Sequence, residues 1–574
     1  MEKFFTANPD GSYSVKGIEY GLKIFGHRIS VLIENTEYAC LDVRCSMPKT
    51  LDDNSGFQPE NESELPTLVA VNEGKGEVTF VWSGKSDLWV KKYTLTCNYL
   101  RFKFEVTVTG NGRVDSVNYF SGNMQEARHG SIYEFYEGYH PAKEWDSSKS
   151  HYFVTSKPCH RFAVYTVPPM FCFAFKVKGF TKQLGLGLVA KRGEHNFHHF
   201  DYNVDSDAFH SGGFYLSTDQ YGHAVVDGEW TAPAIIGYSG MDEWDVLTKY
   251  CNYYYSSGIA IPHTDAKKPR FWYGPLACGW IEQMIRADGV IEKMNEATQP
   301  VYEEIMEKMK RFGLKPSAIV IDDKWQKEYA IDVVDTDKWS DIRGFVDKQL
   351  NEDGIRTMLW FKLWDPEGLC DEACIRNDRG NKFIDPTHPE FLKLLDAAIE
   401  RTLSDAPGCY NCAGYKLDYA MDNPVGRNVK SYNGKYGVEL LYEYISHIYK
   451  KAKSVKPDAL INCSPCHPYF ADVCDQARLH DYDGLCRMNR EELTARAKVF
   501  SIVFPGVLLD TDNAGFNTYR DTMNWLINQN TVGVPSIYSL LTSDTCNLTD
   551  EDFEAVASMW DEYIAIIDKK VKAD

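Results

Sequence analysis

Several signals that would place this chain in other protein classes are missing from its sequence. The N-terminus, MEKFFTANPD, has no basic stretch followed by an apolar run of signal-peptide length, and no window resembles a membrane span. The 16 cysteines do not show the spacing of a disulfide framework. These absences argue against a secreted disulfide scaffold or a membrane protein, so we expect a cytoplasmic protein with reduced thiols.

Positive charge is also scarce. The chain has 62 Lys and Arg against 82 Asp and Glu, and its net charge of -20 should repel phosphate backbones and anionic membranes. A glycine-rich dinucleotide turn and a P-loop are both missing. We therefore expect neither nucleic acid nor a membrane as a partner.

The N-terminal part of the chain has a sequence pattern typical of β-strands. Apolar and polar residues alternate over 76–82, 99–108 and 224–226, and Gly, Asn and Asp separate such stretches. This pattern predicts an antiparallel β-sandwich domain over residues 1–240. Near Asp242 the apolar residues change from alternation to helical spacing, and we expect residues 241–269 to form a helical linker.

One histidine tract in this region invites a metal interpretation. His195, His198 and His199 precede Asp201, and such residues can coordinate zinc. There is no cysteine or second carboxylate at ligand spacing, and the alternation is that of a strand. We therefore favour a structural role for the tract.

The region 270–574 has a different pattern, in which short apolar runs alternate with amphipathic segments such as 301–312 and 437–449. Eight strand-helix units in roughly 300 residues predict an α/β fold, a (β/α)8 TIM barrel, behind the β-sandwich. The eight expected strands are 271–273, 318–321, 357–361, 415–417, 459–462, 477–479, 506–509 and 536–538.

Polar and aromatic residues follow these runs, at the barrel end where chemistry is found. They are Trp280, Asp322, Asp323, Lys324, Trp325, Lys362, Trp364, Asp365, Lys416, Asp418, Cys463, Asp481, Asp483, Asp510 and Asp512. Carboxylates paired across a Trp-lined cavity suit cleavage of a glycosidic bond. Asp365 and Asp512 fit a turn or a helix cap equally well.

A divalent-metal site is the alternative for so many carboxylates. Lysine, arginine and tryptophan separate them here, and Lys416, two residues before Asp418, would oppose a cation. We therefore expect no metal and no organic cofactor.

Short motifs on successive strands resemble the α-galactosidase superfamily, most closely glycoside hydrolase family 36. IVIDDKWQ (319–326) resembles its "DDGW" strand, and FIDPTHP (383–389) its "LDxTHP" segment. YKLD (415–418) resembles the "KxD" nucleophile strand. NCSP (462–465), followed by Asp475, Arg478 and Asp481, resembles the "CGSP…D…R…D" acid/base region.

The resemblance implies that Asp418 is the nucleophile of a retaining double displacement. It implies that Lys416 and Arg478 bind sugar hydroxyls. Asp322 and Asp323 would accept hydrogen bonds from the hydroxyls at positions 4 and 6. The remaining implied contacts are a pocket wall of Trp280, Trp325 and Trp364 and a floor at Cys463.

Two features depart from the family pattern. The carboxylate that acts as acid/base in the family falls on Tyr482 here, between Asp481 and Asp483, and we prefer Asp481. Lys324 replaces the glycine of "DDGW", which bears on sugar specificity. We also expect no C-terminal β-domain, which leaves homo-oligomer formation open.

The resemblance thus implies an α-galactosidase that acts on small galactosides. The alternatives are an α-glycosidase or transglycosylase for another sugar, such as an α-glucoside or α-N-acetylgalactosaminide, and a catalytically silent carbohydrate-binding protein. The exact sugar, the linkage and the role of the N-terminal domain stay open at this point.

Overall fold

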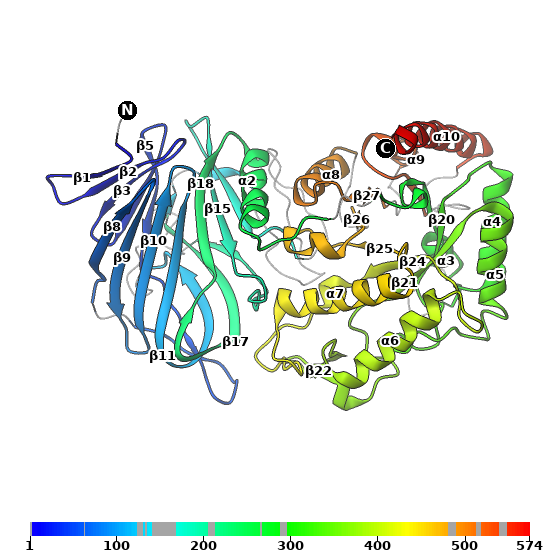
Figure 1. Cartoon of the computed structure of the whole chain (residues 1–574), viewed down its shortest axis with the longest axis horizontal. Helices are drawn as coiled ribbons and strands as arrows, with labels where there is room; N and C mark the ends of the chain where they lie inside the picture. The colour runs from blue at the N-terminus through cyan, green and yellow to red at the C-terminus, as the bar shows by residue number, and fades with distance from the viewer. Residues whose placement is uncertain are drawn as a thin grey trace.

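A computed structural model shows two β-rich bodies side by side, with helix α2 (Glu243–Ser256) between them (Figure 1). It describes residues 3–61, 64–122, 130–132, 135–139, 168–204, 213–263, 267–287, 295–479, 490–512, 518–538 and 548–573.

The first body is antiparallel throughout its described strand pairings. Its strands are β1 (Phe5–Ala7), β2 (Tyr13–Lys16), β3 (Gly21–Phe25), β4 (Arg28–Ile33), β5 (Thr36–Asp42), β6 (Lys49–Thr50), β7 (Phe57–Gln58), β8 (Thr67–Gly74), β9 (Glu77–Lys85), β10 (Val90–Asn98), β11 (Phe102–Tyr119), β12 (Gly130–Ile132), β13 (Phe135–Tyr139), β14 (Cys172–Val177), β15 (Gln183–Val189), β16 (Asp201–Val204), β17 (Gly213–Thr231) and β18 (Ala234–Gly240).

Alternating burial explains why these segments form a sandwich. In β9, Val78, Phe80 and Trp82 are buried, while the residues between them are more exposed. Side chains two apart share a face of a strand, so the buried set forms one continuous inner layer. The predicted antiparallel sandwich is confirmed, and the three expected strands fall in β9, β11 and β17.

The second body is a closed parallel barrel. Its eight strands are β19 (Leu276–Cys278), β20 (Ala318–Ile321), β21 (Arg356–Lys362), β24 (Gly414–Asp418), β25 (Leu460–Cys463), β26 (Gln476–Arg478), β27 (Leu508–Asp510) and β28 (Ser536–Ile537). A parallel bridge between Asp510 and Val534 joins the two ends of the sheet. The predicted (β/α)8 fold is confirmed.

The first barrel strand was expected at 271–273, and this prediction is wrong. Residues Arg270–Tyr273 form a 3-10 helix, η1, after Pro269. The strand is instead Leu276–Cys278, which pairs with both β20 and β28. Proline presets its own φ for a turn, and this outweighs the aromatic strand propensity of the residues that follow it.

Helices surround the barrel, namely α3 (Trp280–Arg286), α4 (Gln299–Arg311), α5 (Ile342–Lys348), α6 (Pro389–Leu403), α7 (Gly437–Val455), α8 (Arg490–Val503), α9 (Tyr519–Leu526) and α10 (Asp550–Ala573). A small hairpin, β22 (Cys374–Arg376) with β23 (Lys382–Ile384), stands apart from the barrel sheet. Over the described stretches, none of the helices has the length and apolar character needed to span a bilayer.

Alternation along the strands divides the barrel core into two layers. Ala318 and Val320 of β20 belong to an inner cluster with Met358 and Trp360, whereas Ile319 packs in the outer cluster under the helices. In β24, Tyr415 and Leu417 take the outer positions. Lys416 and Asp418 must therefore face the barrel axis.

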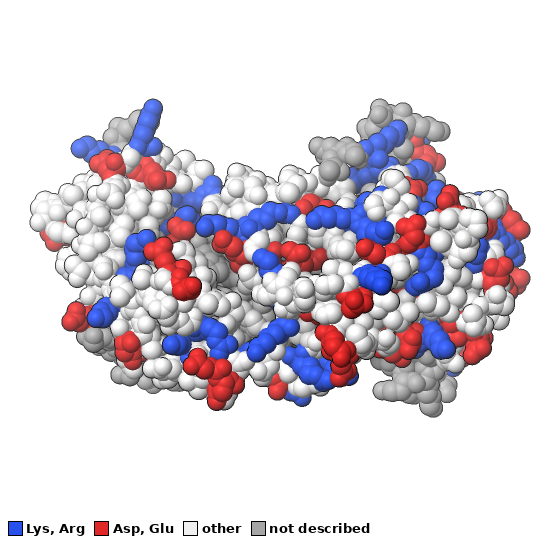
Figure 2. All heavy atoms as spheres, turned by 60° about the horizontal axis from the view of Figure 1, so that its bottom comes forward, with Lys and Arg blue, Asp and Glu red and all other residues white. Residues whose placement is uncertain are grey.

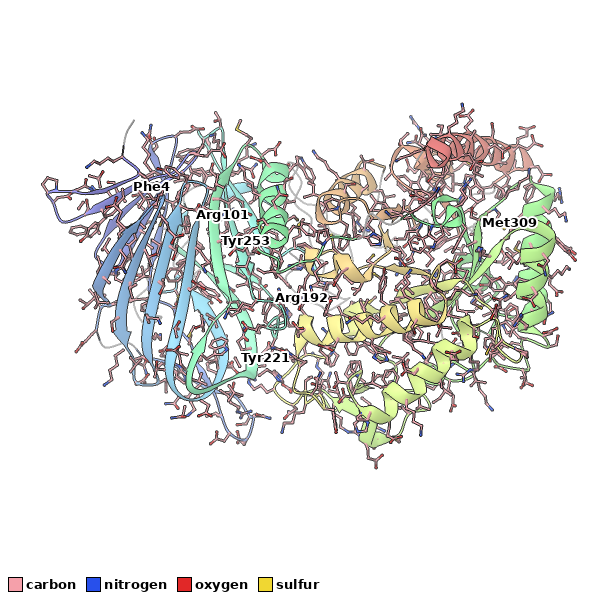
Figure 3. The ribbon with its side chains drawn as sticks, viewed as in Figure 1. Phe4, Arg101, Arg192, Tyr221, Tyr253 and Met309 are labelled. Atoms are coloured by element: carbon pink, nitrogen blue, oxygen red, sulfur yellow. The ribbon has the colours of Figure 1, made fainter. Side chains whose placement is uncertain are left out.

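The two bodies meet along a polar and aromatic seam. Tyr250 of α2 donates to the Leu188 carbonyl at 2.8 Å, and its hydroxyl lies 3.2 Å from Nε2 of His467. Arg192, labelled in Figure 3 on the sandwich side of the seam, forms a 2.7 Å ion pair with Asp472. The seam therefore joins the sandwich firmly to the barrel.

The histidine tract lies at this seam. His195 stacks on Tyr469 with ring centroids 4.0 Å apart, and burial lowers the pKa of His195 to about 3. The expected strand alternation is not found, because the regular strand here, β16, begins only at Asp201. Among the described residues, no group of three or more His, Cys, Asp or Glu could hold a metal ion.

Candidate active site

Asp418 ends strand β24, and three donors hold its carboxylate. Nη2 of Arg478, from β26, donates to Oδ1 at 2.8 Å, and the backbone N–H of Tyr419 donates to the same oxygen at 2.9 Å. Nε1 of Trp360, from β21, donates to Oδ2 at 3.0 Å. These bonds stabilise the ionised carboxylate and orient it in the barrel mouth.

Lys416, two residues before Asp418 on the same face of β24, pairs with Asp322. Its Nζ lies 3.0 Å from Oδ2 of Asp322, and the Cys278 thiol donates to the same oxygen at 2.9 Å. Burial lowers the pKa of Lys416, but the charges of Asp322, Cys278 and Asp512 together outweigh burial and raise that pKa well above its ordinary value. Lys416 is therefore a permanent cation at the base of the site.

Asp323 follows Asp322 and behaves differently. It accepts a hydrogen bond from the Tyr329 hydroxyl at 2.7 Å. Burial raises the pKa of Asp323 to about 6, Asp322 and Asp418 add to the rise, and Tyr329 and Lys362 oppose it. The charge of Asp323 thus changes close to neutral pH.

Arg478 links Asp418 to a second acidic pair. Its Nη1 lies 3.4 Å from Oδ2 of Asp512. The Asp512 N–H donates to Oδ1 of Asp510 at 3.0 Å, and Asn462 donates to Oδ2 of Asp510 at 2.8 Å. Burial raises the pKa of both carboxyl groups, against the effect of Arg478.

The inner site therefore carries more acid than base. Among the described residues, five carboxyl groups face two cations, and all seven residues are at most 7% exposed. Burial disfavours the charged forms of Asp323, Asp510 and Asp512, so these three carboxyl groups take up protons more readily than exposed ones do. Its members are Asp322, Asp323, Asp418, Asp510, Asp512, Lys416 and Arg478.

Strained backbone marks the ends of these strands. Lys324, Trp364, Tyr419 and Asp512 adopt φ angles of 68°, 71°, 62° and 40°, a region that non-glycine residues seldom occupy. Each residue stands just beyond β20, β21, β24 or β27. Such strain is typical of functional sites, where neighbouring contacts hold the unusual conformation.

Further out, the mouth is lined by tyrosines and alternating charges. Nζ of Lys362 lies 4.3 Å from the Tyr329 ring centroid and 4.9 Å from that of Tyr419, and it pairs with Asp365 at 2.8 Å. Lys324 covers the Tyr329 ring at 4.0 Å and pairs with Glu367. Lys324 thus supports Tyr329, the partner of Asp323.

Asp422 adds another carboxyl to this outer region. It closes the 3-10 helix η5 (Ala420–Asp422), directly after β24. Although its side chain keeps access to water, the surrounding protein raises the pKa of Asp422 to about 6, against Lys362 and with Asp418 and Asp365.

The structure brings together Asp418, Lys416, Arg478, Asp322 and Asp323, all predicted from the sequence. Trp280 opens α3 and packs partly buried against the inner cluster. Asp481 and Asp483, the two acid/base candidates, lie outside the described residues.

Three other predicted residues do not join the site. Trp325, Trp364 and Cys463 lie in the outer cluster, each at most 1% exposed. Cys463 shares the outward face of β25 with Ile461. Lys324, next to Trp325, and Trp364 itself have positive φ, so strand alternation does not continue through them. All three residues therefore pack in the outer cluster rather than beside Asp418.

Three residues that sequence reasoning missed take these places. Cys278 contacts Asp322 from β19, Trp360 contacts Asp418, and Tyr329 contacts Asp323. Parity along the strands was the available signal for Trp360, since it stands opposite Lys416 in the parallel register of β21 and β24.

Comparison with known proteins bears on the fold. No family model matches the chain, and no curated protein sequence matches it. Among solved structures, the family 36 α-galactosidase AgaA from Geobacillus stearothermophilus, in complex with stachyose, aligns with a TM-score of 0.52 at 11% identity, over 97% of this chain and 86% of that one. This chain has the fold of the family 36 α-galactosidases.

Two further structures agree. The galactosidase domain of the α-galactosidase-sucrose kinase AgaSK gives a TM-score of 0.51 at 11% identity, over 98% of this chain and 87% of that one. The cycloalternan-forming enzyme of Listeria monocytogenes, solved with a pentasaccharide substrate, gives 0.51 at 13% identity over 96% of this chain. This chain spans 56% of the length of that enzyme.

Proposed function

We propose that the protein is a retaining α-glycosidase and that Asp418 is its nucleophile. The observation that carries the proposal is the Asp418 carboxylate, which Arg478, Trp360 and the Tyr419 N–H hold at the mouth of a barrel with the family 36 fold. An oriented, charge-stabilised carboxylate beside further sugar-binding polar groups is what double displacement requires.

In the first step an Asp418 oxygen bonds to the anomeric carbon while the bond from that carbon to the leaving oxygen breaks. The leaving oxygen takes a proton from a general acid, and a glycosyl ester of Asp418 results. In the second step water loses a proton to the same group and attacks the anomeric carbon, which frees Asp418 with net retention of configuration.

We assign the general acid to Asp481, with Asp483 as its rival. Arg478 touches Asp418, and Asp481 stands only three positions after Arg478 in the sequence. Asp483 stands five positions after it. The shorter tether supports the preference for Asp481.

The remaining inner residues suit a sugar ring. Lys416 and Arg478 are donors, and Asp322 and Asp323 are charged acceptors for hydroxyls. Buried groups of this kind discriminate strongly, because a sugar that lacks the matching hydroxyl leaves them unpaired. With the α-galactosidase fold as support, a terminal α-galactoside is the proposed substrate.

We place the catalytic machinery in residues 270–574 and treat 1–240 as a sandwich domain joined by the helical linker 241–269. A small carbohydrate is the proposed partner, and the cytoplasm the proposed location. We propose that catalysis needs no metal or organic cofactor.

The test is release of an aryl alcohol from α-galactoside, α-glucoside and α-N-acetylgalactosaminide substrates. The α-galactoside should react fastest, EDTA should not slow it, and Asp418→Asn should abolish it. Asp396→Asn, a change on α6 at a half-exposed carboxylate that lies 2.7 Å from His447, is the matched control and should leave the rate intact. Release from none of the three substrates would contradict the proposal.

A further inference from the structure

A second cleft lies on the sandwich, away from the barrel carboxylates. It has a volume of about 440 Å3, and the described residues that line it all fall between Lys103 and Ile259. Its walls come from β11, β17 and β18, from the segment after β15 and from the end of α2. Pockets of roughly 300 to 1,000 Å3 commonly hold small molecules.

A large bulge in β17 builds one wall. Ala224 pairs with Val114 and Asp219 pairs with Ser116, so the four residues 220–223 stand opposite a single residue, Asp115. The bulge is held from the barrel side, because the His223 ring stacks on Tyr436 at 3.8 Å and its Nε2 lies 2.9 Å from the Gly426 carbonyl. Bulges re-aim side chains and are frequent at binding sites.

The bulge carries Gln220, and the unpaired amide of this side chain suggests that the cleft binds a ligand. Gln220 lines the cleft and is 2% exposed, yet its Nε2 has no hydrogen-bond partner within the described part of the chain. A buried amide donor without a partner costs about 1 to 3 kcal/mol. A bound acceptor, such as a hydroxyl or ether oxygen, would recover that cost.

The charges of the cleft are arranged for a neutral ligand. Two lysines and three glutamates line it. Lys103 pairs with Glu105 at 2.9 Å, and Lys191 lies 4.0 Å from Glu194. Because these lysines already face carboxylates, neither a phosphate nor a carboxylate ligand meets a dedicated cationic group here.

Two aromatic side chains complete the lining. Trp230 and Tyr253 are both partly buried, and each packs against the sandwich core. Arg101 covers one face of the Tyr253 ring at 4.8 Å, and Figure 3 labels both residues on the part of the sandwich near the barrel. Indole and phenol rings pack on the C–H faces of sugars while their polar atoms meet hydroxyls.

We propose that this cleft is a second carbohydrate-binding site, which takes a short neutral oligosaccharide through Trp230, Tyr253 and Gln220. The proposal rests on the proposed function only in expecting a saccharide ligand. An apolar ligand would leave Gln220 unsatisfied, and an anionic one would meet the three glutamates. Figure 2 shows that one face of the molecule is hollowed between its two halves.

The experiment is calorimetric titration of raffinose and of maltotriose into full-length Asp418→Asn protein, which cannot turn them over. We expect at least one trisaccharide to bind at a site that Trp230→Ala and Gln220→Leu each weaken about tenfold or more. Trp244→Ala, on α2 outside the cleft, is the matched control and should leave this binding unchanged.

A third change separates the two sites. Lys416→Met removes the cation of the barrel site and should not affect binding at the cleft. Loss of saccharide binding with Lys416→Met, together with unchanged binding in Trp230→Ala and Gln220→Leu, would overturn the cleft proposal. Binding of neither trisaccharide up to tens of millimolar would also overturn it.

The two proposals fail in distinguishable ways. Binding that responds to Trp230 and Gln220 in a protein without glycosidase activity would uphold the cleft and refute the enzyme. Melting curves show whether the Trp230→Ala protein is folded. If it is unfolded, Gln220→Leu gives an independent result, because leucine is close to glutamine in volume.

Discussion

Removing the Tyr329 hydroxyl should shift the pH at which the protein binds its sugar. Burial raises the pKa of Asp323 to about 6, and the 2.7 Å hydrogen bond from Tyr329 limits that rise because it favours the ionised carboxylate. Sugar hydroxyls donate more strongly to the ionised form, because it is a charged acceptor. Binding should therefore weaken as pH falls through about 6.

The size of the shift follows from the bond that is lost. A hydrogen bond to a charged group contributes about 1.5 to 3 kcal/mol, which corresponds to about one to two pH units at 1.36 kcal/mol per unit. In Tyr329→Phe, binding should therefore weaken already as pH falls through roughly 7 to 8. The loss occurs at higher pH because Asp323 is protonated more easily.

The assay is the dissociation constant of galactose for Asp418→Asn protein, with and without Tyr329→Phe, measured from acidic to mildly alkaline pH. Tyr419→Phe is the matched control, since Tyr419 packs beside the same Trp360 ring while Asp323 takes its bond from Tyr329. A Tyr329→Phe profile that coincides with the parent, or moves to lower pH, would refute this reasoning.

Two other changes test neighbouring groups. Lys416→Met leaves the Asp322 carboxylate buried without its cation, so we expect a loss of about 3 to 5 kcal/mol in the free energy of unfolding by urea at neutral pH, and an unchanged denaturation midpoint would contradict the pairing. For the general acid, Asp481→Ala should slow a substrate with a poor leaving group far more than one with an activated leaving group, because only the former needs protonation. Asp483→Ala and Asp422→Ala should slow both substrates alike, and the reverse pattern in either variant would move the assignment there.

The barrel could be predicted from the sequence because its strands are fully buried apolar runs between amphipathic helices. Ala318–Ile321 begins and ends where it was expected. The bounds of the barrel strands that follow it differ from the expected bounds by one or two residues. The first strand escaped because Leu276–Cys278 is only three residues long and follows an aromatic turn that itself resembles a strand.

Within the site, residues inside strands were more predictable than residues beyond them. Lys416 and Asp418 share the inner face by simple alternation, and both reach the axis. The same alternation places Cys463 on the outer face of β25 and Asn462 on the inner face, where it donates to Asp510. The motif comparison had assigned the pocket floor to Cys463 without considering this alternation. Trp325 and Trp364 could not be placed this way, because the chain leaves the strand at residues with positive φ.

Contacts between strands depend on register, which alternation along one strand does not contain. Cys278 contacts Asp322 because of the register between β19 and β20, and Trp360 contacts Asp418 because of the register between β21 and β24. The β-sandwich showed a similar limit. Its strands were predicted, but the β17 bulge that forms the second cleft arises from a local mismatch between two long strands.

The most direct test of the central claim is to trap the covalent intermediate. The protein would be treated with a 5-fluoro glycosyl fluoride, digested, and examined by mass spectrometry for a glycosylated peptide. The mechanism predicts one sugar bound through an ester to Asp418, in the peptide that contains Gly414–Asp418. A sugar on any other residue, or full turnover with no trapped ester and an active Asp418→Asn variant, would contradict it.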